Sequence, residues 1–275
     1  MKENKIKIFQ LIKFYLIFLL FFNENTIFSK EFILIQSTTS AQDSGFYEYL
    51  IPKFKQRFNI EIRVVAVGTG QAIRNAMNCD ADLLLVHHQP SEVSFIEDGF
   101  GLYRKVIMEN NYVIIGPKQS FQPIKDNKGL TFFFKKIYND KINFISRGDY
   151  SGTHQKELEL WQLSNLLPNP KKNQWYFDVG QGMGATLNIA VNKNAYTISD
   201  RASWINFKNK QNHVVLSENI LELKNDYSVI PINPKKCPNT KVRESKVFID
   251  WIISEEGKRY INNFKVNQKQ VFISK

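Results

Sequence analysis

The chain has 275 residues, of which 43% are hydrophobic, and 37 lysines and arginines against 26 acidic residues give it a net charge of +11. This length and composition exclude a disordered protein and favour one large or two modest globular domains. The basic residues are scattered, without a long basic block or a nucleic-acid-binding motif, so we expect no nucleic-acid partner. The positive charge suits solubility and the attraction of a small anion.

The first residues differ in character from the rest of the chain. Lys2, Lys5 and Lys7 precede an apolar run, residues 14–22, that is too short to cross a bilayer as a helix. The pattern predicts a signal peptide over residues 1–29 and a periplasmic protein, whose charge falls from +11 to +9 with the loss of four lysines and two glutamates. Only Ser29 fits a small-residue cleavage site, so an uncleaved membrane anchor is the alternative.

Short apolar runs then alternate with helical patterns. Residues 32–36, 62–67 and 83–86 predict buried strands, because each run is short, rich in branched side chains and followed by polar or glycine residues. Apolar residues at a spacing of four predict a helix over residues 46–58, kinked or restarted at Pro52. Strands that alternate with helices are typical of a parallel sheet covered on both faces.

A second α/β series follows. It has predicted strands at residues 112–116, 142–146 and 195–199, a loop around 117–129 and a helix at 153–163. A strand at 227–232 precedes helices near 242–253 and 255–264, which we expect to return to the first sheet. The chain therefore predicts two lobes, residues 30–112 with 230–275 and residues 113–229, each a sheet flanked by helices. Residues 112–116 and 227–234 are the candidate hinges.

Unusual turns follow the predicted strands, where open α/β sheets bind ligands. The first has four consecutive hydroxyl side chains, at residues 37–40. Thr38, Thr39 and Ser40, with free backbone N–H groups nearby, predict a site that surrounds an anion with neutral donors. The alternative is a helix cap with solvated neighbours.

The second turn contains Gly68, Thr69 and Gly70. Its glycines permit a tight turn that points amides toward a ligand, and Thr69 adds a hydroxyl group. No Gly-Lys-Ser/Thr sequence follows, which excludes a nucleotide P-loop, and a plain turn is the alternative.

The third turn combines a cation, hydroxyl groups and glycine at a predicted helix start. Arg147 can form a bidentate bond to an oxyanion, and Ser151, Gly152 and Thr153 add donors at the helix N-terminus. The alternative is that Asp149 pairs with Arg147 and that Ser151 only caps the helix.

A fourth turn carries Gly182 and Gly184 at the start of another helix, which predicts close backbone approach either to a ligand or to the opposing lobe. His87 and His88 have no carboxylate or cysteine at metal-ligand spacing, so we expect them on the surface or in a supporting position, and no metal site. Ser151 and His154 lack the Gly-x-Ser-x-Gly elbow of a hydrolase.

Two cysteines, Cys79 and Cys237, are far apart in the sequence. An oxidising compartment permits a disulfide between them if the fold brings them together. Two separate thiols are equally consistent with the sequence.

Several stretches together carry a family resemblance. They are residues 38–45, 65–72, 80–87, 146–154, 180–187 and 199–201. In this order they resemble the TupA-like tungstate-binding proteins of ABC importers, which have the two-lobed type II periplasmic binding (Venus-flytrap) fold. Ser37 stands where the family usually has a threonine, and Cys79 stands where a glycine is common.

The resemblance implies an extracytoplasmic solute-binding protein that captures tungstate, or molybdate, for a permease in the inner membrane. It implies a ligand held by Thr39 and Ser40 on one lobe and by Arg147, Ser151 and Thr153 on the other. We expect a monomer without a cofactor and without catalytic residues. The alternatives are a binding protein for phosphate- or sulfate-type oxyanions, a ligand-sensing domain and, least, a periplasmic hydrolase.

A phosphate site differs in one requirement, since monohydrogen phosphate carries a proton and favours a carboxylate acceptor. Asp43 and Asp149 are the acidic residues in these turns that would supply one.

Overall fold

The structure is a computed structural model that describes residues 31–119, 123–217 and 219–275, and Glu31–Lys275 forms one compact unit. The predicted signal peptide, residues 1–29, lies outside the described residues. In the described part of the chain, no helix is both long and apolar enough to cross a membrane.

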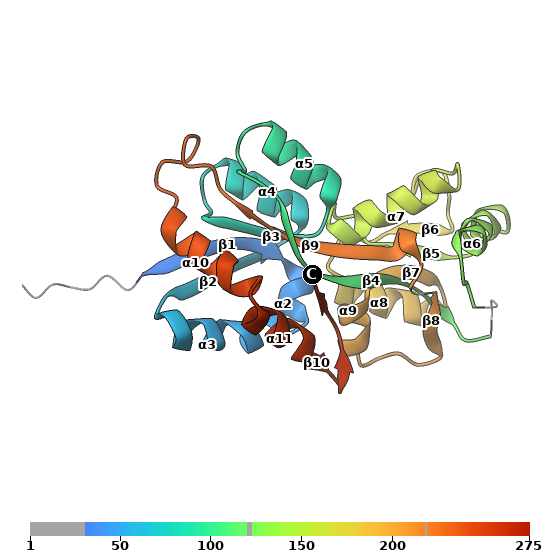
Figure 1. Cartoon of the computed structure of the whole chain (residues 1–275). Coiled ribbons are helices and arrows are strands. Elements are labelled where there is room, and N and C mark those ends of the chain that lie inside the picture. The colour runs from blue at the N-terminus through green and yellow to red at the C-terminus, as the bar shows by residue number, and fades with distance from the viewer. Residues whose placement is uncertain (1–30, 120–122, 218) are drawn as a thin grey trace, which may run out of the picture. The chain divides into compact units, whose positions relative to one another are not determined.

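A mixed sheet runs through this unit (Figure 1). In the described residues it has ten strands, of which eight follow the order β2-β1-β3-β9-β4-β7-β5-β6, while β8 and β12 also pair with β4. The strands are β1 (Phe32–Thr38), β2 (Glu61–Val67), β3 (Leu83–Val86), β4 (Lys105–Pro117), β5 (Phe144–Ser146), β6 (Tyr176–Asp178), β7 (Tyr196–Asp200), β8 (His213–Ser217), β9 (Lys224–Pro231) and β12 (Ile273–Ser274). A separate hairpin joins β10 (Lys265–Val266) to β11 (Lys269–Gln270).

Helices cover this sheet along its length. They are α2 (Thr39–Asp43), α3 (Phe46–Phe58), α4 (Thr69–Met77), α5 (Gln89–Glu97), α6 (Asn127–Asn139), α7 (Gly152–Leu163), α8 (Met183–Asn192), α9 (Arg201–Asn206), α10 (Val242–Ile252) and α11 (Glu255–Asn263), with a 3₁₀ turn at Leu221–Leu223.

The first half of the sheet confirms the predicted alternation. β1 pairs in parallel with both β2 and β3, and α3 lays its predicted apolar face, including Phe46, Leu50 and Phe54, into the core beside them. The prediction of a restart at Pro52 is wrong, because α3 continues through it. Proline removes a single helical hydrogen bond, and burial of the flanking turns compensates for that loss.

The second half contains a helix that the sequence interpretation missed. Residues 117–129 were expected to form a loop, but α6 begins at Asn127, where the side chain of Asp126 accepts a hydrogen bond from the Gly129 N–H at 2.7 Å. The helix buries Phe133, Phe134 and Ile137 against β5 and β7. Spacings of three and four among its apolar residues are typical of such a helix.

The C-terminal helices return to the first half of the sheet, as predicted. Phe248, Ile249 and Trp251 of α10 and Ile261 of α11 lie in one hydrophobic cluster with residues of β1 and β3. The halves are joined by β4, which pairs with β9 up to Asn111 and with β7 from Tyr112. The lobe boundaries at residues 112 and 229 fall inside β4 and β9 and remain a prediction.

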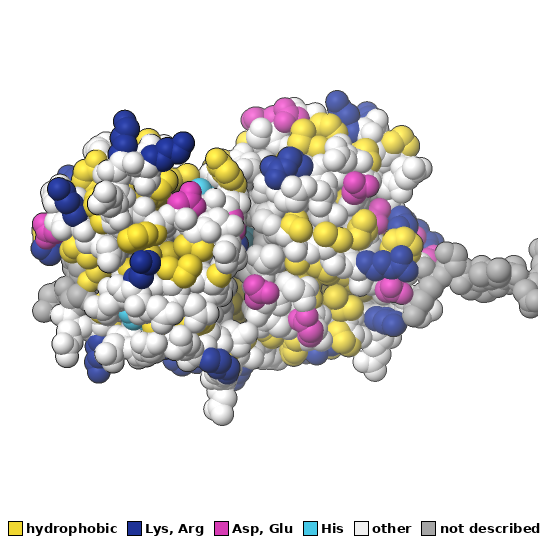
Figure 2. All heavy atoms as spheres, turned by 180° about the vertical axis from the view of Figure 1, so that it is seen from behind, with side chains coloured by type: hydrophobic (Ala, Val, Ile, Leu, Met, Phe, Trp, Pro, Cys, Tyr) yellow, Lys and Arg dark blue, Asp and Glu magenta, His cyan; other side chains and the backbone are white. Residues whose placement is uncertain are grey.

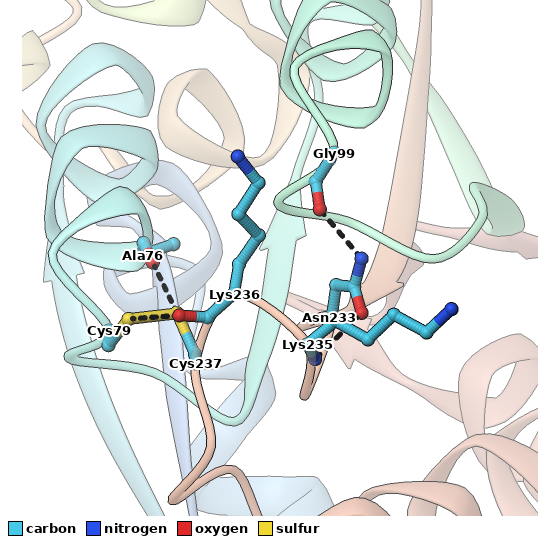
Figure 3. The surroundings of a disulfide bond; sticks show 7 residues. All are labelled: Ala76, Cys79, Gly99, Asn233, Lys235, Lys236 and Cys237. Atoms are coloured by element: carbon cyan, nitrogen blue, oxygen red, sulfur yellow. Dashed lines mark hydrogen bonds between the residues drawn. A yellow bond between two sulfur atoms is a disulfide. The ribbon is translucent and has the colours of Figure 1, made fainter.

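A disulfide ties the end of α4 to the segment after β9. Figure 3 shows Cys79 and Cys237 joined beneath Ala76, across a sequence separation of 158 residues. Cys79 has a φ of +64°, in the left-handed region where glycine has the lowest cost. The structure therefore selects the disulfide from the two alternatives that the sequence left open.

The basic side chains lie apart on the face shown in Figure 2, where no continuous strip of lysine and arginine is visible. Several of them pair locally, as Lys246 does with Asp250 at 2.6 Å. On this face the distribution is typical of a solvated surface.

Candidate functional site

The second and third turns meet at the N-termini of α4 and α7. A Cβ added to Gly68 would lie 3.9 Å from the Cα of Ser151, and one added to Gly152 would lie 3.2 Å from the Thr69 hydroxyl oxygen. Gly70 is similarly close to the backbone of Tyr150. Segments about 80 residues apart in the sequence are thus in van der Waals contact.

The two helix starts leave backbone donors at this junction. Gly68 caps α4 without a side-chain hydrogen bond, while Ser151 caps α7 by accepting a hydrogen bond from the His154 N–H at 3.4 Å. The N–H groups of Gly152 and Thr153 have no partner within α7, as in the first turn of any helix. Two positive helix ends that meet at one point favour an anion between them.

Thr69 supplies a further donor. It is 2% exposed, and its hydroxyl group finds no hydrogen-bond partner among the described residues. An unpaired buried hydroxyl destabilises a protein unless something else bonds to it. Its position beside Gly152 therefore matches a site that is completed by a ligand.

Arg147 is buried and ion-paired. Its Nε and one terminal nitrogen lie 3.0 and 2.5 Å from one oxygen of Asp149, whose other oxygen accepts a hydrogen bond from the Ser151 N–H at 3.1 Å. The structure thus contains the pairing and the helix cap that the sequence offered as the alternative for this turn. The pairing braces the turn and places a guanidinium group beside the start of α7.

The first turn is largely buried, and its hydroxyl groups are linked. Thr38 and Ser40 lie 3.1 Å apart, oxygen to oxygen, and Ser40 also lies 2.9 Å from Nε2 of His87. Thr39 is half-buried at the start of α2. His87 in turn lies against Gly152, so the first turn is connected to the junction of the other two.

The fourth turn has open space beside its two glycines. A Cβ added to Gly182 or to Gly184 would meet no atom within 4 Å, so the structure shows no close approach at either glycine. Their role in the site stays a prediction.

The structure adds a hydrogen-bonded cluster that the sequence interpretation missed, although its central residue, Asp200, lies in the family-resemblance stretch 199–201. The carboxylate of Asp200 accepts hydrogen bonds from Asn110, Asn225 and Tyr227, all at 2.9 Å, and it also caps α9. The Tyr227 hydroxyl reaches Ser40 at 3.5 Å. No local signal could have found this cluster, because its members come from three strands that are distant in the sequence.

Asp43 is, with Asp149, one of the two acidic residues that the sequence offered as a carboxylate acceptor for phosphate. Partial loss of solvent raises its pKa, and the charge of Arg147 opposes this rise. The carboxyl group is therefore within electrostatic reach of the guanidinium group, although its side chain is exposed. In the described part of the chain, no three His, Cys, Asp or Glu side chains gather into a metal-binding cluster.

Comparisons with known proteins agree with this geometry. A family model described as a PBP superfamily domain matches residues 30–256. The tungstate-binding protein TupA of Peptoclostridium acidaminophilum is 39% identical over 238 residues, which cover 86% of this chain and 82% of the relative. This chain belongs to the TupA family. A TupA protein of Campylobacter jejuni is also 39% identical, over 85% of this chain and 87% of its own length.

A solved structure extends the match to three dimensions. The tungstate-binding protein TupA of Desulfovibrio alaskensis G20 has a TM-score of 0.77 at 37% identity, over 89% of this TupA-family chain and 99% of that one. The predicted α/β fold of the type II periplasmic binding proteins is thereby confirmed.

The close contact at Gly152 allows a test of whether the junction of the second and third turns is needed for binding in this TupA-family chain. In Gly152→Ala, the new Cβ would lie 2.7 Å from Cε1 of His87, a buried ring held by hydrogen bonds at both nitrogens. The turns should separate, and we expect oxyanion affinity to fall by about 1–3 kcal/mol. Isothermal titration calorimetry on the purified variant measures the loss.

Gly184→Ala is the matched comparison, because its Cβ would enter open space. It should leave affinity unchanged and add up to about 1 kcal/mol of helix stability. Equal affinity in Gly152→Ala and the wild type would contradict the tight junction, while a loss in Gly184→Ala would assign the fourth turn to the site.

Proposed function

We propose that this chain is the extracytoplasmic solute-binding protein of an ABC importer and that it captures tungstate, with molybdate as the nearest competitor. The observation that carries the ligand class is the meeting of the α4 and α7 N-termini beside Arg147, with the unpartnered Thr69 hydroxyl between them. Relatives named tungstate-binding proteins support the choice of tungstate among oxyanions.

The binding chemistry follows from the donors. Tungstate is a dianion that presents only acceptor oxygens at neutral pH. Neutral hydroxyl and amide groups can therefore donate a hydrogen bond to each of its oxygens. Thr39, Ser40 and Thr69 would serve the ligand from one half of the sheet, and Ser151 and Thr153 from the other. Thr38, Gly68, Gly70 and Gly152 would shape the turns and orient their amides. Arg147 supplies the charge that partly offsets the dianion.

The remaining assignments belong to the same proposal. A binding protein of this class delivers its ligand to a permease in the inner membrane, and we place the mature chain in the periplasm as a monomer without a cofactor. It is not an enzyme in this proposal. His154 supports that view, since its Nδ1 accepts a hydrogen bond from the Tyr150 N–H at 3.0 Å instead of receiving a serine proton.

Calorimetry of the purified mature chain with tungstate, molybdate, sulfate and phosphate tests the proposal. Tungstate should bind at least about a thousandfold more tightly than phosphate or sulfate, which corresponds to roughly 4 kcal/mol. The physical reason is that the third turn offers donors and no free carboxylate, since both oxygens of Asp149 are already bonded to Arg147 and Ser151.

A phosphate-binding protein is the second candidate, and the raised pKa of Asp43 near Arg147 favours it. In that case Asp43 would accept the proton of monohydrogen phosphate, and Asp43→Asn would selectively weaken phosphate. Comparable heats for phosphate and tungstate in the wild type would overturn the tungstate assignment and leave the anion site in place.

A further inference from the structure

His87 lies between the first turn and a strand in the middle of the sheet. Its Nε2 is 2.9 Å from the Ser40 hydroxyl oxygen, and its Nδ1 is 2.9 Å from the hydroxyl oxygen of Tyr112 on β4. All three side chains are at least nine-tenths buried, with exposed fractions of 6% for His87, 4% for Ser40 and 1% for Tyr112. Water therefore cannot replace these partners freely.

The ring is neutral under ordinary conditions. Burial lowers the pKa of His87 to about 3, a hydrogen bond with the Asn225 side chain opposes this shift, and the charges of His88 and Arg147 add to it. A neutral imidazole donates through one nitrogen and accepts through the other. The direction of the whole chain of hydrogen bonds is thus set by which nitrogen carries the proton.

Tyr112 decides between the two tautomers. Its hydroxyl group has His87 as its hydrogen-bond partner and no other in the described part of the chain. If Nδ1 carried the proton, the buried Tyr112 O–H would lack an acceptor, which is costly. The amide oxygen of Asn225 is the rival acceptor, because the Asn225 side chain lies close enough to the ring to raise the pKa of His87, but this oxygen forms no well-aligned hydrogen bond with the described residues.

With Nε2 protonated, both ring nitrogens and the Tyr112 hydroxyl group are paired: Tyr112 donates to Nδ1, and Nε2–H donates to Ser40. The Ser40 oxygen then accepts from His87, and its own proton is free to point toward the junction of the turns. Thr38 lies 3.1 Å away and can donate to the same oxygen. Ser40 becomes a donor toward the ligand.

We propose that His87 and Tyr112 are positioning residues that fix Ser40 as a hydrogen-bond donor, so that the site selects an anion presenting only acceptors. The inference rests on the proposed oxyanion-binding function, which it deepens by naming a determinant of selectivity. A protonated oxyanion such as monohydrogen phosphate has a donor of its own, and a Ser40 held as a donor cannot accept it.

The tautomer can be observed directly. The chain has four histidines, so ¹⁵N-histidine labelling gives four rings in a long-range ¹H–¹⁵N correlation spectrum, and His87→Gln identifies the signals of His87. We expect a neutral ring protonated at Nε2, before and after tungstate is added. A ring protonated at Nδ1 would overturn the proposal whether or not any oxyanion binds.

Tyr112→Phe tests the consequence for binding, since it removes the hydroxyl group that fixes the tautomer while filling the same space. Tungstate affinity should fall about tenfold, the equivalent of one hydrogen bond. The ratio of tungstate to phosphate affinity should fall as well, because Ser40 could then donate to His87 and accept from phosphate. An unchanged ratio would overturn the proposal.

Tyr176→Phe is the matched control. Tyr176 is also buried and donates to Glu157 at 2.7 Å, but it lies in the hydrophobic cluster of the second half. It should lower the melting temperature without changing the affinity ratio. If the wild type binds neither tungstate nor any other oxyanion, the proposed function fails, and the spectrum still decides the direction of the hydrogen-bond chain.

Discussion

Replacing Arg147 with alanine should weaken tungstate binding by about 2–5 kcal/mol, as when one partner of a desolvated charge pair is removed. Arg147 is 4% exposed, so its guanidinium group is a buried positive charge beside the two helix starts. Without it, a dianion would be held by neutral donors alone. Arg147→Lys keeps the charge but loses the planar fork, and its loss of affinity should be smaller.

The ion pair between Arg147 and Asp149 offers a different role for the arginine, that of stabilising the turn rather than binding the ligand. If Arg147 only braces the turn, Arg147→Ala and Asp149→Asn should lower the melting temperature alike while tungstate affinity survives. Calorimetry and thermal unfolding of both variants without ligand separate the two roles. An unstable Arg147→Ala protein that still binds tungstate tightly would show that the arginine is structural.

Loss of the Cys79–Cys237 disulfide should lower the free energy of unfolding by about 3–5 kcal/mol. The bond closes a segment of 158 residues, and in the chain-entropy model such a long loop restricts the unfolded chain strongly. Chemical denaturation of the wild type, with and without reductant, measures the effect. An unchanged midpoint in a sample whose two thiols are shown to be free would contradict it.

A pair of double variants separates the bond from the backbone strain. Cys79→Gly with Cys237→Ala removes the bond and relieves the positive φ of residue 79, whereas Cys79→Ala with Cys237→Ala removes the bond alone. The glycine version should be more stable by about 1 kcal/mol. Equal stabilities would mean that this backbone conformation relaxes once the bond is gone.

Local patterns were sufficient for most of the secondary structure. The strands β1, β2 and β3 were predicted within two residues, because short branched runs between polar turns have few other interpretations. The signal for α6 was present as well, in the Asp126 cap and the spacing of Leu130, Phe133 and Ile137. It was overlooked because the preceding residues have the polar composition of a loop.

The site could be predicted only in pieces. The hydrogen-bond donors of each turn could be predicted from the residues of that turn. The partner of each donor could not, because it comes from elsewhere in the chain. Gly152 illustrates the difference, since its local sequence suggested room for a ligand, and the structure shows that it also makes room for the ring of His87. The role of Tyr112 has no local signal, because its hydroxyl group meets a residue 25 positions away.

The position of Asp200 constrains how the molecule can move. Its carboxylate binds Asn110 of β4 and both Asn225 and Tyr227 of β9, at the place where the pairing of β4 passes from β9 to β7. Sliding of one strand along another would break several buried hydrogen bonds at once, whereas a change of backbone torsion on either side would break none of them. We therefore expect the cluster to act as a fixed pivot if the two predicted lobes rotate. Because Tyr227 also reaches Ser40, the first turn would then sit close to the axis of rotation, and the distant surface of the second half would travel furthest.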